Sequence, residues 1–442
     1  MATGAATAAA TAEPATSARS GARTLPGRLA LAALCVVYVL LAALPAAPGS
    51  RVVLATAGGS PDRLLGPLQP FGLSGASGSS AGPLLYAGMW VALVLYSAVL
   101  VRAGDISRRA AVATIAGLHV VFLLAPPLLS QDVFSYIAYA RLGVEHGLSP
   151  YTHSPLDIPH DAVFGFAGSK DAVSVYGPAF TLLTYPLSPL GVAGAYWVLK
   201  VVAAAASLGV VALVWKTAER LGRDPLRPAL LVGLSPLVLV HVVSAAHNEA
   251  LVVLLTMAGV YAFARGQPRA AGALSTFAAG LKASAGLVVP YLVLGARPRV
   301  RSAVVGVAAA ALALAVIGLA GFGSGVLDSL GLLSSNQGRS SRLSLPYLVS
   351  ELVGNRGVVR ALFGLAFAGV AAWTLWSTWR GADPIRMAGW ATLAILLASA
   401  WLVPWYLLWL LPLAALAADR RLAVATVALS GWVLAIGVPG IY

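Results

Sequence analysis

Long apolar runs alternate with short basic clusters along most of the chain. Many of these runs reach the roughly 17–25 residues that an α-helix needs to cross the apolar core of a bilayer. Helices are the default in lipid, because the backbone there must satisfy its own hydrogen bonds. The pattern therefore predicts an all-α polytopic membrane protein with about 11–13 membrane segments.

The basic clusters indicate how the runs are threaded, because cytoplasmic loops carry the excess of lysine and arginine. With the N-terminus inside, the chain crosses outward over residues 29–48, inward over 84–101 and outward again over 110–129. The later predicted crossings are 193–215, 229–246, 250–264, 302–321, 358–379, 387–403, 404–418 and 422–438. We expect a multi-pass protein of the plasma membrane with a cytoplasmic N-terminus.

One apolar segment does not fit a simple crossing. Residues 270–296 lie between two basic clusters that the threading places on the same side. About 25 residues suffice for two half-helices of roughly 18 Å each, at 1.5 Å per residue. We therefore expect a hairpin that enters the membrane and returns, with Lys282 at its apex.

Composition sets the remaining boundaries. Of the 442 residues, 59% are hydrophobic and 10% are charged, against about 25% charged residues in soluble proteins. Residues 1–25 are rich in Ala, Thr and Ser and are predicted to form a disordered cytoplasmic tail. Residues 26–442 are predicted to form one transmembrane domain with outer loops at 130–175 and 322–357. The net charge of +14 comes from short loop clusters, so it indicates topology and lipid contact rather than nucleic acid.

Polar and aromatic residues gather in the first outer loop. A helix that starts at Asp132 would place a carboxylate, tyrosines and a histidine on one face, because they lie three or four positions apart. That face comprises Asp132, Ser135, Tyr136, Tyr139, Gly143 and His146. We expect an amphipathic helix lying at the membrane interface, with aromatic faces suited to sugar rings. Taken alone, Asp132 fits a helix N-cap as well as it fits a site.

Ionisable residues also occur in other places near the membrane. His247 and Glu249 flank Asn248 at an outer helix end, where such groups face a polar cavity or cap the helix. Lys282 stands alone among Ala, Gly and Leu, where an ammonium needs an anion or must reach the interface. Arg339 and Arg342 lie in the second outer loop, where their forked side chains can bind the phosphate of a substrate or of a lipid headgroup.

A metal site is not indicated by the histidines of the first outer loop. His153 and His160 lie seven positions apart, with no dense cluster of ligands around them. We predict no metal.

Five short elements together resemble the integral-membrane glycosyltransferases of the GT-C type. They are Asp132, GLSPY at 147–151, YGP at 176–178, His247-Asn248-Glu249 (HNE) and Leu281-Lys282. More narrowly, the chain resembles the actinobacterial polyprenol-phosphate-mannose-dependent α-(1→6)-mannosyltransferases, which build the mannan backbone of lipomannan and lipoarabinomannan. The resemblance covers residues 25–440.

This resemblance implies a reaction. The enzyme would transfer a mannosyl residue, with inversion, from a polyprenyl-phosphate donor to a glycan or glycolipid acceptor on the outer face of the membrane. Asp132 would be the general base, and Lys282, Arg339 and Arg342 would stabilise the departing lipid phosphate. No metal or other cofactor is required. The implied substrate-binding residues are Tyr136, Tyr139, His146, Tyr151, Tyr176, His247, Asn248 and Glu249.

The sequence leaves several alternatives open. Many relatives place the key acid after the first helix, whereas two extra helices precede it here. Asp157, Asp161 and Asp171 therefore remain candidates for the base. The donor sugar could also be another one, such as arabinose. Competing functions are a lipid or small-molecule transporter or flippase, a ligase that uses a pyrophosphate-linked glycan, and a structural membrane protein.

Overall fold

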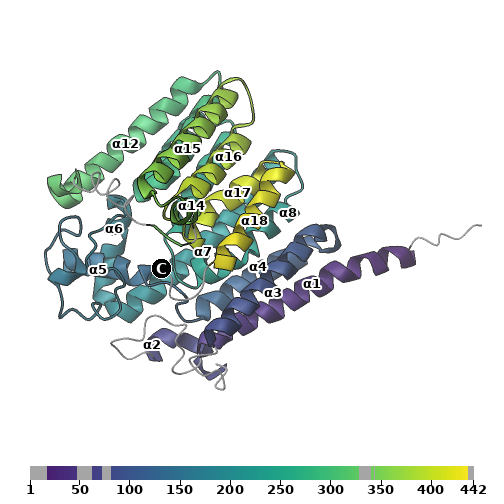
Figure 1. The fold of residues 1–442 in the computed structure, drawn as a ribbon, viewed down its shortest axis with the longest axis horizontal. Coiled ribbons are helices and arrows are strands. Elements are labelled where there is room, and N and C mark those ends of the chain that lie inside the picture. Colours follow the sequence, from purple (N-terminus) through teal and green to yellow (C-terminus); the bar gives the residue numbers. More distant parts are fainter. Residues whose placement is uncertain (1–16, 47–61, 72–80, 328–339, 343, 437–442) are drawn as a thin grey trace, which may run out of the picture.

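The computed structural model describes residues 17–46, 62–71, 81–327, 340–342 and 344–436. Within these segments all regular structure is helical, which confirms the predicted all-α class. The α-helices are α1 (Ser17–Ala43), α2 (Asp62–Leu65), α3 (Ala81–Val101), α4 (Arg108–Leu124), α5 (Asp132–Val144), α6 (Pro178–Thr184), α7 (Gly191–Arg220), α8 (Leu226–Gly233), α9 (Glu249–Ala264), α10 (Pro268–Leu281), α11 (Val289–Gly295), α12 (Val300–Phe322), α14 (Leu345–Val353), α15 (Arg356–Trp379), α16 (Pro384–Ala398), α17 (Leu407–Leu416) and α18 (Arg420–Ile436). Figure 1 shows α15 and α16 running side by side, with α1 and α3 on the opposite side of the molecule.

Five of the described segments are long and apolar enough to cross a membrane, so the protein is polytopic. They are Pro26–Ala43, Gly82–Val101, Pro178–Arg220, Val300–Val326 and Arg356–Trp379. Shorter apolar helices accompany them, α9 and α16 among them. The total of about 11–13 membrane segments stays a prediction.

The crossing predicted over residues 229–246 is interrupted. Helix α8 ends at Gly233, and a π-helical turn, Val238–Val243, follows after a break. The break at Leu234–Ser235 comes directly before Pro236, which lacks an N–H and whose ring would clash with a preceding helical carbonyl. Two further differences are found. Helix α1 begins at Ser17 rather than near residue 29, and a helix that was not predicted, α14, lies within the predicted second outer loop.

Two short helices are present where the half-spanning hairpin was predicted. Helix α10 has 14 residues and α11 has 7, which correspond to about 21 Å and about 10 Å of helix. Neither can cross an apolar core of roughly 30 Å. Lys282 breaks the helix between them with an extended backbone, at φ −152° and ψ 121°, before the 3₁₀ turn Ala283–Val288.

The basic loops lie together at one end of the helices. Polar contacts connect the loops α3–α4, α7–α8, α9–α10, α11–α12 and α15–α16 through pairs whose members are far apart in sequence. These contacts are Arg108–Asp224 at 3.2 Å, Arg223–Asp383 at 3.6 Å, Arg299 to the Gly266 carbonyl at 3.5 Å and Arg297 to the Trp379 carbonyl at 2.9 Å. The threading that treats these loops as one face of the membrane is therefore geometrically consistent.

Helix α5 is present as predicted, but its surroundings differ. Residues on every side of it are buried, including Val133, Ile137 and Leu142, which were expected to point away from the polar face. Phe134 stacks on Phe166 and on Tyr196, with ring centroids 5.3 Å and 5.8 Å apart. The prediction of an amphipathic helix at the interface is wrong, because the chain that follows α5 folds back over it.

Candidate active site

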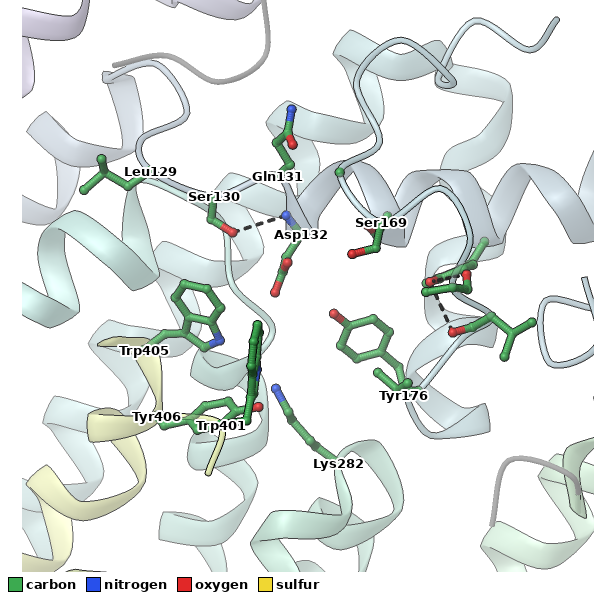
Figure 2. A pocket seen from close by; sticks show the side chains of 16 residues that line it. Leu129, Ser130, Gln131, Asp132, Ser169, Tyr176, Lys282, Trp401, Trp405 and Tyr406 are labelled. Atoms are coloured by element: carbon green, nitrogen blue, oxygen red, sulfur yellow. Dashed lines mark hydrogen bonds between the residues drawn. The ribbon is translucent and has the colours of Figure 1, made fainter. Parts of the chain in front are cut away.

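A cavity of about 400 Å³ opens where α5, the apex of the α10–α11 hairpin and the turn between α16 and α17 meet. Figure 2 shows Asp132, Tyr176, Lys282 and the aromatic residues of that turn facing a common space. The lining residues are Leu129, Ser130, Gln131, Asp132, Ser135, Tyr139, Gly168, Ser169, Ala172, Val173, Val175, Tyr176, Lys282, Trp401, Trp405 and Tyr406. Among the described residues, the lining includes one carboxylate, Asp132, and one cation, Lys282.

Asp132 sits at the start of α5, where its backbone N–H donates to the Ser130 hydroxyl at 3.2 Å. Its side chain is 35% exposed, so the carboxylate is open to the cavity. The N-terminal end of a helix favours a negative charge. The Asp132 carboxylate therefore faces the cavity from the start of a helix.

A chain of ionisable groups leads away from this carboxylate into the protein. His247 Nδ1 lies 3.6 Å from Asp132 Oδ2 and 3.5 Å from Glu249 Oε2. Glu249 Oε1 accepts a hydrogen bond from the Lys282 ammonium, which returns to the cavity. The side chains of His247 and Glu249 are fully buried. A buried carboxylate requires a paired cation, so Glu249 fixes the position of the Lys282 ammonium.

The HNE element is held from two sides. The His247 ring stacks on Trp405 with centroids 4.0 Å apart and planes 22° from parallel. On the other side, the Tyr136 hydroxyl donates to Asn248 Oδ1 at 3.5 Å and accepts from the Asn248 N–H at 3.4 Å. These contacts fix the start of α9, so that His247 faces Asp132 instead of turning to solvent.

The YGP element docks directly onto the hairpin apex. The Gly177 N–H donates to the Leu281 carbonyl at 3.0 Å. A Cβ on Gly177 would lie 1.7 Å from the Gly280 carbonyl oxygen, so only glycine permits this approach. Pro178 then starts α6 at a position where its missing N–H costs nothing. As a result, the Tyr176 ring lies 5.8 Å from the Lys282 ammonium.

The opposite wall of the cavity was not predicted from the sequence. Trp401, Trp405 and Tyr406 reach it from the turn between α16 and α17. The Tyr406 ring lies 5.0 Å from the Lys282 ammonium and stacks on Trp409 at 4.1 Å. The available signal was a cluster of aromatics around Pro404, at a helix end that the predicted threading puts outside, which also fits an interfacial aromatic belt.

The other acids of the first outer loop have different partners. Asp161, with its side chain 2% exposed, receives hydrogen bonds from Arg141 at 2.7 Å and His146 at 2.9 Å. Burial alone would raise the pKa of Asp161, but these hydrogen bonds outweigh it and hold the pKa below its usual value. Asp157 closes a capping box with Ser154, and the exposed Asp171 is outside the lining. Of the four candidate bases, Asp132 is the one that lines the cavity.

The predicted substrate contacts divide into two groups. Tyr139 and Tyr176 line the cavity, and the Tyr139 hydroxyl also donates to the Ala172 and Val173 carbonyls at 3.0 and 3.3 Å. The other predicted contacts are not part of the lining: Tyr136, Tyr151, His247, Asn248 and Glu249 are buried behind it, and His146 is paired with Asp161. Tyr151 supports the wall, because its hydroxyl donates to the Tyr176 carbonyl at 2.8 Å.

The two arginines of the second outer loop are not part of the described cavity wall. Arg342 is exposed and outside the lining, and Arg339 lies outside the described residues. In the part of the chain that the structure describes, no group of three or more His, Cys, Asp and Glu side chains is arranged to hold a metal ion.

Comparison with known sequences identifies the family. The family model described as alpha-(1→6)-mannopyranosyltransferase, N-terminal domain, matches residues 29–297. The chain belongs to the α-(1→6)-mannopyranosyltransferase family. A second family model, described as MptB C-terminal domain, matches residues 354–440. The resemblance inferred from the short elements is therefore confirmed, and family membership favours a membrane mannosyltransferase over a transporter.

Individual members of the α-(1→6)-mannopyranosyltransferase family are similar over most of the chain. The chain is 30% identical over 401 residues to alpha-(1→6)-mannopyranosyltransferase A of Mycobacterium tuberculosis, covering 80% of this chain and 75% of the relative. It is 30% identical over 371 residues to a probable alpha-(1→6)-mannopyranosyltransferase of Mycolicibacterium smegmatis, covering 70% of this chain and 66% of the relative. No solved structure matches the chain.

The cavity is assembled from both matched segments. Asp132, Tyr176 and Lys282 lie in the segment that matches the N-terminal domain of the family. The aromatic wall of Trp401, Trp405 and Tyr406 lies in the segment that matches the C-terminal domain. Neither segment alone contains a complete site.

Proposed function

We propose that this protein transfers a mannosyl residue, with inversion, from a polyprenyl-phosphate donor to a glycan or glycolipid acceptor, extending an α-(1→6)-linked mannan. The observation that carries the proposal is the cavity, in which the Asp132 carboxylate and the Lys282 ammonium face a shared space between aromatic walls. Membership of the α-(1→6)-mannopyranosyltransferase family supports the choice of sugar and linkage.

In this mechanism Asp132 is the general base. An acceptor hydroxyl loses its proton to the Asp132 carboxylate as its oxygen attacks the anomeric carbon. The bond between that carbon and the phosphate oxygen breaks on the opposite face, which inverts the configuration. The lipid phosphate leaves as a monoester, so its negative charge grows during the reaction.

Lys282 is suited to that growing charge. An ammonium has three donors, and one of them is used by Glu249. The remaining donors can point at the leaving phosphate, and a cation held in place before the reaction stabilises the transition state without reorganisation. Arg339 and Arg342 stay predictions for the same phosphate.

The orientation follows from charge. The basic loops gather at one end of the helices, and by the positive-inside rule that end is cytoplasmic. Asp132, the hairpin apex and the α16–α17 turn belong to the other end of the threading. We therefore place the active site on the outer face of the plasma membrane, where a polyprenyl chain can remain in the bilayer while its phosphate enters the cavity.

The test uses purified protein in nanodiscs, radiolabelled polyprenyl-phosphate mannose and a short α-(1→6)-mannoside. Wild type should transfer mannose, Asp132→Asn should lose about 10²- to 10⁴-fold in rate while retaining donor binding, and Asp171→Asn should behave as wild type. Asp171 is a matched control, because it is an acid of the same loop that lies outside the lining.

The outcomes separate the parts of the proposal. Full activity of Asp132→Asn would contradict its role as the base. Absence of transfer by wild type, with donor and acceptor verified, would contradict the assigned donor, and a panel including polyprenyl-phosphate arabinose would then test the sugar.

A further inference from the structure

The turn between α16 and α17 presents Trp401 to the cavity in an extended segment. Ser399, which caps the end of α16, has φ −69° and ψ 127°, and Val403 has φ −129° and ψ 151°. Trp401 is partly exposed and lines the cavity, whereas Trp405 is only 7% exposed. Of these two indoles, Trp401 therefore offers the larger open surface to a ligand.

Ser341 clamps the backbone on both sides of Trp401. The Ser341 N–H donates to the Ala400 carbonyl at 2.9 Å. Its hydroxyl donates to the Leu402 carbonyl at 2.6 Å and accepts from the Leu402 N–H at 3.0 Å. Ser341 is 3% exposed, so these bonds are shielded from water.

The clamp is itself fixed by the start of α14. The Ser344 N–H and hydroxyl both donate to the Ser341 carbonyl, at 3.0 and 2.8 Å. Ser344 also caps α14, with its hydroxyl accepting from the Tyr347 N–H at 3.2 Å. The second outer loop thereby sets the position of a cavity residue that is about 60 positions away in sequence.

We propose that Trp401 is the stacking surface for an uncharged hexose ring of the acceptor, and that Ser341 is its positioning residue. This inference rests on the proposed function. The donor can be held through its phosphate and its lipid, but a neutral glycan offers only hydroxyls and apolar C–H faces. An indole supplies a large flat apolar surface at little cost in conformational entropy. The acceptor sugar ring must also lie close to Asp132, which receives the proton of the attacking hydroxyl.

The neighbouring aromatics have other roles. Trp405 stacks on His247, and Tyr406 stacks on Trp409 beside the Lys282 ammonium. Both rings therefore support the ionic chain that runs from Asp132 to Lys282. This division assigns the acceptor sugar to Trp401 and the electrostatics of the donor side to Trp405 and Tyr406.

The first experiment compares Michaelis constants for acceptor and donor in three variants. Trp401→Leu should raise the acceptor KM about tenfold or more, because it removes one stacking contact, with a much smaller change in the donor KM. Trp401→Phe should recover most of the loss. Trp373→Leu should match wild type, because Trp373 is 53% exposed on α15 and lies outside the cavity. Equal changes in both constants, or an unchanged acceptor KM, would overturn the assignment.

A double-mutant cycle tests the clamp. Ser341→Ala should raise the acceptor KM in the wild-type background and add little in the Trp401→Leu background, because both changes act on one contact. Ser341→Thr, which keeps the hydroxyl, should restore part of the affinity. Fully additive effects would show that Ser341 does not act through Trp401.

A binding measurement separates this inference from the proposed function. Saturation-transfer NMR with an α-(1→6)-mannoside and no donor should show binding to wild type and weaker binding to Trp401→Leu. That result without any mannosyl transfer would retain the acceptor surface and reject the donor assignment. Equal binding by both proteins would reject the stacking surface even if transfer occurs.

Discussion

Two pairs of short helices, α10–α11 and α16–α17, meet at the cavity. The first contributes a charged residue and the second contributes aromatic residues. The α10–α11 hairpin brings Lys282, whose ammonium is fixed by an ion pair with the buried Glu249. The α16–α17 pair brings Trp401, whose backbone is fixed by neutral hydrogen bonds from Ser341. The first pair therefore has an ionic anchor and the second an uncharged one, which should make their tolerance to substitution very different.

Both pairs were expected from the sequence, but only the role of the first at the candidate site was predicted. An isolated lysine in an apolar segment is energetically costly unless it has a partner, so its presence indicates a candidate site. Tryptophan is common at membrane interfaces whether or not it binds a ligand. The charged residue of the α10–α11 hairpin can therefore be recognised from the sequence. The aromatic residues of the α16–α17 pair can be assigned to the cavity only once the fold places them across from Asp132.

The largest expected effect is loss of the ionic anchor. Lys282→Met should reduce transfer by about 10²- to 10³-fold, because it removes a preorganised charge from the leaving phosphate. It should also destabilise the protein by about 3–5 kcal/mol, because the buried Glu249 carboxylate loses its lysine partner. Thermal unfolding in detergent and single-turnover transfer measure the two effects.

A double variant sharpens this result. Glu249→Gln combined with Lys282→Met should recover much of the stability and none of the activity. Recovery of transfer in the double variant would contradict a direct role of Lys282 at the phosphate.

The next effect concerns the packing of the hairpin apex. Gly177→Ala should cost about 1–3 kcal/mol through overpacking, because the added Cβ would overlap the Gly280 carbonyl. It should also lower transfer by displacing Lys282. Gly286→Ala is the control on the same hairpin, since its added Cβ would meet only the Ala279 Cβ at 3.6 Å. Similar melting temperatures for the two variants would show that the apex is not tightly fixed.

The smallest expected effect on stability comes from an ionic cluster that belongs to neither helix pair. It serves as a reference for the effects at the two pairs. Asp161 faces Arg141 and His146, and Glu145 lies 3.9 Å from Arg141. Because the pKa of Asp161 is lowered on folding, its stabilising contribution is present above about pH 4 and is lost as the pH falls further. The difference in melting temperature between wild type and Asp161→Asn should therefore shrink below that pH. A difference independent of pH would contradict the assignment.

Much of the fold could be predicted from hydrophobic runs and basic clusters. The short helices α10 and α11 were predicted because residues 270–296 lie between two basic clusters assigned to the same side of the membrane. That segment is too short for two full crossings. The break between α8 and the π-helical turn at Val238–Val243 did not follow, because a proline in a membrane helix kinks, breaks or is tolerated according to its neighbours.

The site was predictable where charge marks it and uncertain elsewhere. Asp132 and Lys282 were named from the sequence, and the structure brings both to one cavity. His146 and Asp161 also looked like site residues, but they are hydrogen-bonded to each other outside the cavity lining. Tyr136 and Tyr151 carry structural hydrogen bonds, which cannot be distinguished from ligand contacts without knowing the residues they face.

The short length of α10 has a consequence for the membrane itself. With 14 residues it is about 21 Å long, which is about 9 Å less than the thickness of an average apolar core. In the proposed orientation, a donor phosphate that meets Lys282 would therefore descend below the headgroups of the surrounding lipids. The depth of that descent varies with bilayer thickness, so a thinner membrane should present its lipid-linked sugars to this protein with less hydrophobic mismatch than a thicker one.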